Sequence, residues 1–143
     1  MDEPQTNEEI MMKGIEEGLP LGNETILVVK DNHEVRKVTG RILRMQGYRV
    51  LEASNPNIAF STCTQHEGPI HLVITDVVML EMNGPELAKR LTSFYPEMKV
   101  LYMSGYVKNF ISHQGILEKG MNYIQKPFTV DKLTRKVREV LDK

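Results

Sequence analysis

Short hydrophobic runs alternate with amphipathic stretches from residue 25 to the end of the chain. The first run, Thr25–Val29, is rich in β-branched residues and uninterrupted, which is typical of a parallel strand buried on both faces. It is followed by apolar residues at three-to-four spacing, which predict a helix over 32–46. The residues expected on the inward face of that helix are Val35, Val38, Ile42 and Met45.

The same alternation predicts four more strand–helix pairs. Strands are expected at 48–52, 70–75, 100–103 and 121–125, and helices at 55–66, 85–95, 107–118 and 130–141. Asn55 followed by Pro56, and Thr129 before the last helix, are good N-terminal helix signals. Five strands alternating with five helices predict an α/β fold, a doubly wound five-stranded parallel sheet.

Composition is consistent with one globular domain of 143 residues, 41% of them hydrophobic. Residues 1–24 carry seven acids and one base, so we expect an acidic flexible tail or linker there and the domain at 25–143. The single cysteine, Cys63, excludes an internal disulfide and is expected in the core. Scattered bases without tryptophan argue against direct nucleic-acid binding. No apolar run is long enough to insert in a membrane. The single cysteine favours a reducing compartment, so a cytoplasmic location is expected.

Polar residues stand where the predicted strands end. Lys30 and Asp31 follow the first strand, Asp76 follows the third, Ser104 the fourth and Lys126 the fifth. Parallel strands bring their carboxyl ends to one edge, where such sheets bind ligands. Two carboxylates there favour a hard cation such as Mg²⁺, and a hydroxyl and an ammonium group suit phosphoryl oxygens. A carboxylate attacked at phosphorus forms an acyl phosphate.

Residues 25–142 resemble the receiver domain of two-component response regulators, including receivers attached to hybrid sensor histidine kinases. The resemblance implies the flavodoxin-like strand order 2-1-3-4-5 with five helices. The matching segments are 26–31, 73–79 together with Gly84, 101–106 and 125–128. The resemblance implies a phosphorelay in which Asp76 is the phosphoacceptor, assisted by Ser104 and Lys126. It further implies that Mg²⁺ is held by Asp31, an Asp76 oxygen and the backbone carbonyl of Val78, and that Ser104 and Tyr123 change position as a switch.

The resemblance also implies the partners. The phosphoryl donor is expected to be a sensor histidine kinase or a histidine phosphotransfer protein, and a downstream protein is expected to bind the face formed by 107–142. A homodimer is left open. Such a domain is not an enzyme acting on an external substrate, because its chemistry is limited to its own phosphorylation and autodephosphorylation.

Lys30 departs from the resemblance, because receivers usually carry an acid at this position. We expect a lysine there to weaken Mg²⁺ binding. Its ammonium group has two alternatives: it extends into water, or it pairs with Asp76 and takes the place of the metal. The second alternative favours a different function, a pseudo-receiver that docks protein partners without phosphorylation.

Two further functions are less consistent with the sequence. The segment His33-Glu34-Val35-Arg36 is similar to the phosphorylated box of sensor kinases, but Lys37 and Val38 stand where that box continues with Thr-Pro. A nucleotide or flavin enzyme is disfavoured, because neither a glycine-rich dinucleotide fingerprint nor a P-loop occurs.

Overall fold

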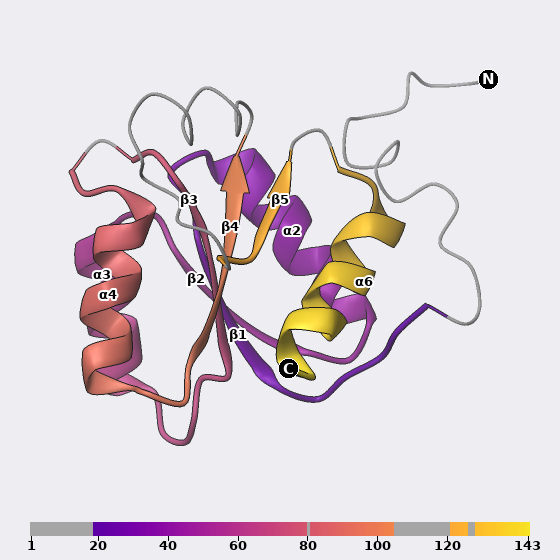
Figure 1. The fold of residues 1–143 in the computed structure, drawn as a ribbon, viewed down its shortest axis with the longest axis horizontal. Coiled ribbons are helices and arrows are strands. Elements are labelled where there is room, and N and C mark those ends of the chain that lie inside the picture. The colour runs from indigo at the N-terminus through magenta and orange to yellow at the C-terminus, as the bar shows by residue number, and fades with distance from the viewer. Residues whose placement is uncertain (1–18, 80, 105–120, 126–127) are drawn as a thin grey trace.

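The strands form one parallel sheet with the order β2-β1-β3-β4-β5, as predicted (Figure 1). This computed structural model describes residues 19–79, 81–104, 121–125 and 128–143. The strands are β1 (Thr25–Val29), β2 (Arg49–Ala53), β3 (Leu72–Asp76), β4 (Lys99–Ser104) and β5 (Tyr123–Gln125). The described residues contain four helices, α2 (His33–Met45), α3 (Pro56–Gln65), α4 (Gly84–Phe94) and α6 (Val130–Leu141). The helix predicted at 107–118 lies outside the described residues.

Helices cover both faces of the sheet (Figure 1). On one face α2 and α6 pack against alternate residues of the central strands, among them Ile26, Val28 and Ile74. On the other face α3 and α4 cover the intervening residues, such as Leu27 and Val73. This two-sided burial explains why β1 and β3 read as continuous apolar runs.

Helix signals in the sequence set the boundaries well. The side chains of Asn32, Asn55 and Thr129 each accept a hydrogen bond from the backbone three residues on, and Gly47 after α2 has a φ of 99°.

Cys63 is buried as expected, and burial raises the pKa of its thiol. The prediction that Met45 lies on the inward face of α2 is wrong. Met45 is exposed in the last turn, and the core contact there is made by Leu43.

Strand limits differ slightly from the predicted ones. β2 begins one residue later than expected, because Tyr48 is a buried residue of the preceding turn whose amide donates to the carbonyl of Leu43. β5 begins at Tyr123 rather than at residue 121. No helix within the described ranges is long and apolar enough to cross a bilayer.

The segment before β1 packs on the domain. Leu19 is part of the core cluster beneath α2 and α6, and the amide of Gly22 donates to the carbonyl of Gln46 at 3.0 Å. Gly22 and Gly47 approach so closely that a Cβ on Gly47 would lie 2.4 Å from the Gly22 carbonyl oxygen. Among the described residues, packing on the domain already includes Leu19, ahead of the boundary expected at residue 25.

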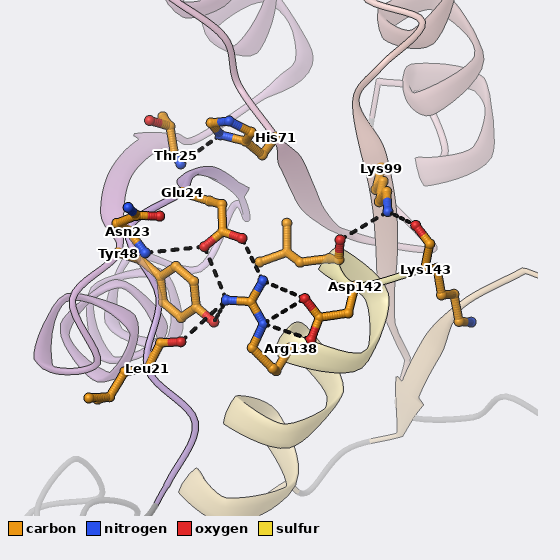
Figure 2. Close-up of polar contacts among 11 residues, drawn as sticks. Leu21, Asn23, Glu24, Thr25, Tyr48, His71, Lys99, Arg138, Asp142 and Lys143 are labelled. Atoms are coloured by element: carbon orange, nitrogen blue, oxygen red, sulfur yellow. Dashed lines mark hydrogen bonds and ion pairs between the residues drawn. The ribbon is translucent and has the colours of Figure 1, made fainter.

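Arg138 on α6 holds this segment through a bidentate ion pair with Glu24 (Figure 2). The distances are 2.5 Å from Nη2 to Oε2 and 3.1 Å from Nη1 to Oε1. The same guanidinium group donates to the Leu21 carbonyl and to the Asp142 carboxylate. The hydrogen bond from Arg138 lowers the pKa of Glu24 to about 2. Two segments more than a hundred residues apart are thus joined by a charge-assisted contact.

The carboxyl end of β3 is held by the start of α4. The Gly84 amide donates to the Val77 carbonyl at 2.7 Å, and the Val77 amide donates to the Met103 carbonyl of β4 at 3.1 Å. A Cβ on Gly84 would lie 2.1 Å from the Asp76 carbonyl oxygen, so a glycine is required for this approach. The backbone at Asp76 and Val77 thus lies between the start of α4 and strand β4.

Replacing Glu24 by Gln should remove a pH-dependent part of the stability. Because the pKa of Glu24 is lowered from 4.5 to about 2 on folding, its contribution is present above pH 4.5 and is lost as the pH falls toward 2. We expect Glu24→Gln to lower the free energy of unfolding by about 1–2 kcal/mol at pH 7. The difference from wild type should disappear across that acid range in urea unfolding experiments. Exposed Glu97 supplies the control, and an equal loss in Glu97→Gln would contradict the role of the Arg138 pair.

Gly84→Ala should be destabilising, since its new methyl group meets backbone rather than a flexible side chain. We expect a loss of about 1–3 kcal/mol in thermal unfolding, as for overpacked sites. Gly40→Ala is the matched control, because its nearest contact is the Arg44 guanidinium group at 3.3 Å, which can move. Similar losses in the two variants would show that the approach to Asp76 is not tight.

Candidate functional site

The carboxyl ends of the strands meet at one edge of the sheet, which is uppermost in Figure 1. In the register, Val29 of β1 lies beside Thr75 of β3, and Asp76 lies beside Met103 of β4. Lys30 directly follows Val29, so it reaches the same level as Asp76. Because side chains alternate along a strand, Lys30 lies on the same face as Val28, and Asp76 lies on the same face as Ile74, two residues earlier in each case.

Lys30 and Asp76 form a buried ion pair. The Lys30 ammonium nitrogen lies 2.7 Å from Oδ2 of Asp76, and each side chain is only 7% exposed. The sequence left open whether Lys30 extends into water or pairs with Asp76. The pairing alternative is confirmed, and the water-exposed alternative is wrong.

Backbone contacts fix the position from which the Lys30 side chain starts. Its amide donates to the Ala53 carbonyl of β2 at 3.0 Å, and its carbonyl accepts from Nη1 of Arg36 at 2.7 Å. Arg36 lies in the first turn of α2, with its Nε 3.6 Å from Oε1 of Glu52. Glu52 also pairs with Arg44, at 3.1 Å. Sequence reasoning missed this cluster, although a charged Glu52 between the apolar residues Leu51 and Ala53 was a usable signal.

The other expected site residues differ in how far the structure places them. Asp31 is exposed, and its Oδ1 accepts from the Asn32 amide at 2.8 Å. Val78 follows β3 with its side chain 52% exposed, and Tyr123 of β5 is 42% exposed. Ser104 is the last residue of β4 and lies beside Gln125 in the register. Lys126 lies outside the described residues.

A small hollow adjoins this edge. Its volume is about 90 Å³, and it is lined by Asp31, Ser54, Asn55, Pro56, Met79 and Glu81. The amide oxygen of Asn55 is already used in capping α3, since it accepts from the Ile58 amide. The hollow therefore offers two carboxylates, from Asp31 and Glu81, next to the carboxyl end of β1.

The donors present do not suit a divalent cation while Lys30 holds its position. No group of three or more His, Cys, Asp or Glu side chains suited to a metal occurs among the residues that the structure describes. The ammonium group already occupies Oδ2 of Asp76. Each unit of like charge at about 4 Å costs about 4 kcal/mol at an effective dielectric constant of 20, so a second cation would be repelled.

Comparison with known proteins agrees with this fold. The response regulator receiver domain family matches residues 26–138. Sensor kinase CckA of Brucella abortus is 33% identical over 122 residues, which cover 85% of this chain and 13% of that kinase. The response regulator receiver protein CpdR of the same organism is 28% identical over 116 residues, 81% of this chain and 95% of CpdR.

A solved structure gives the same result in three dimensions. The receiver domain of the hybrid histidine kinase CckA matches with a TM-score of 0.68 and 33% identity. The match covers 82% of this chain and 98% of that domain. Because the family model matches residues 26–138, this chain belongs to the response regulator receiver domains of two-component systems.

Proposed function

We propose that this receiver domain accepts a phosphoryl group on Asp76 from a phosphohistidine. The observation that carries the proposal is the position of Asp76, a nearly buried carboxylate at the carboxyl end of β3 with a cationic partner at 2.7 Å. That arrangement places positive charge where a phosphoryl group would bring negative charge. Relatives that include a sensor kinase support a histidine kinase or a histidine phosphotransfer protein as donor.

The proposed transfer is a displacement at phosphorus. A carboxylate oxygen of Asp76 forms the new P–O bond as the P–N bond of the phosphohistidine breaks. The electron pair of the P–N bond stays on the imidazole nitrogen, which takes a proton from water. The products are a neutral histidine, an acyl phosphate and a hydroxide ion, which the buffer neutralises. Ser104, at the end of the neighbouring strand, and Lys126 are proposed to contact the phosphoryl oxygens.

We further propose that the acyl phosphate changes the surface that binds a downstream protein. A change in the positions of Ser104 and Tyr123 would alter the surface of residues 107–142 and hence the affinity for a downstream protein. The domain would have no external substrate, and would act in the cytoplasm. Mg²⁺ held by Asp31, Asp76 and the Val78 carbonyl stays a prediction, which the position of Lys30 disfavours.

A second function is favoured by the same ion pair. If the Lys30 ammonium group prevents Asp76 from attacking phosphorus, the domain is a pseudo-receiver whose docking surface is independent of phosphorylation. The buried pair at 2.7 Å is the specific support for this alternative. The two functions differ in one measurable property, the formation of an acyl phosphate on Asp76.

Phosphorylation can be tested with phosphoramidate, which carries a P–N bond like that of phosphohistidine. We expect the intact mass of the wild-type protein to increase by one phosphoryl group, and Asp76→Asn to show no adduct. Asp131→Asn, which changes an exposed acid at the start of α6, should keep the adduct. An unmodified wild type with a native circular dichroism spectrum would contradict phosphoacceptance and support the pseudo-receiver.

A further inference from the structure

We infer that Lys30 is a built-in counter-ion of Asp76 that replaces a divalent cation at this edge of the sheet. The part of the inference that concerns phosphorylation rests on the proposed function. The part that concerns Mg²⁺ binding does not depend on it. It explains the disagreement between the Mg²⁺ that the family implies and the donors that this chain presents. Lys30 thereby acts directly on the carboxylate rather than through another residue.

The contact geometry favours a permanent role for Lys30. Its ammonium nitrogen is within hydrogen-bond distance of Oδ2 of Asp76, and both side chains are almost fully buried. The backbone of Lys30 is held on both sides, by the Ala53 carbonyl and by Arg36. A lysine so held cannot withdraw into water without breaking buried contacts, so its charge stays beside Asp76.

The electrostatic balance of the crevice points the same way. With Lys30 paired to Asp76, the described charges nearest Oδ2 already cancel. The acids that remain nearby, Asp31 and Glu81, line the hollow next to the strand end. A divalent cation would lack the carboxylate of an acid at position 30, would share Asp76 with the ammonium group, and would be repelled by that group.

Stability alone is a poor explanation for this pair. Removing two charges from water offsets much of their attraction, so a buried ion pair adds little compared with apolar residues of similar size. A constant positive charge beside a nucleophilic carboxylate has a clearer use. It can meet the charge of a phosphoryl group without waiting for a metal ion to bind.

The inference is tested first by metal binding, using MgCl₂ as the probe and following both thermal unfolding and calorimetric heat. We expect no Mg²⁺-dependent change in the wild-type protein at millimolar concentration. Lys30→Asp restores a third acid and should bind Mg²⁺ at least about a hundredfold more tightly than wild type. Lys89→Asp makes the same charge change at an exposed position on α4. We expect its thermal unfolding and its calorimetric heat not to respond to Mg²⁺.

Results for the wild type decide the matter even if Lys30→Asp fails to fold. Saturable Mg²⁺ binding by the wild type with a submillimolar dissociation constant would overturn the inference, whatever the variants do. Lys30→Asn, which removes the charge and keeps a polar side chain, is the second variant. Mg²⁺ affinity equal to wild type in both Lys30 variants would also overturn it, because the ammonium group would then have no effect on metal binding.

Phosphorylation with phosphoramidate in the presence of EDTA or of MgCl₂ gives a further, separable test. We expect the wild-type adduct to form to the same extent in both solutions, whereas an adduct that requires Mg²⁺ would overturn the inference. An adduct absent from both solutions would contradict the proposed function alone. The Mg²⁺ titration would then still decide whether Lys30 replaces the metal.

Discussion

Parallel pairing of β1 with β3 is the constraint on which the site depends. Both strands are buried on both faces, so their register is set by the core residues on either side of the sheet. A slip of one residue would exchange the two faces of β1 and separate Lys30 from Asp76. The ion pair at the strand ends is therefore a consequence of hydrophobic packing several residues away. The apolar positions that stabilise the sheet also place the charged ones.

The pair in turn changes what the edge of the sheet can bind. A carboxylate next to acids attracts divalent cations, whereas one already paired with an ammonium group presents little net charge. Burial strengthens the effect, because the Lys30 and Asp76 side chains have almost no water to screen them. Asp31, by contrast, is exposed and bonded to the next backbone amide. Two adjacent residues of one strand end thus have opposite charges and opposite environments.

Much of this was predictable from sequence, and the exceptions have physical reasons. The strand positions, the helix caps and the convergence of Lys30 and Asp76 at one edge follow from periodicity and parallel topology, whereas the strand order followed from the family resemblance. Alternation along β1 places Lys30 on the same face as Asp76, but the choice of its ammonium group between that carboxylate and water leaves no periodic signal. The pair of Glu24 with Arg138 was equally hidden, because charged residues this far apart in sequence have many alternative partners.

Phosphorylation of Asp76 would require the counter-ion to move. The carboxylate charge that Lys30 meets at Oδ2 would be replaced by charge on phosphoryl oxygens farther from the strand. Since the Lys30 backbone is held, only its side chain can follow, and any residual strain would fall on Arg36, which bonds the Lys30 carbonyl from α2. A signal needs an element with two arrangements, and spatial continuity alone does not provide one. α2 contacts the Lys30 carbonyl through Arg36 and packs beside α6 in the same core cluster, so it links the pair to α6.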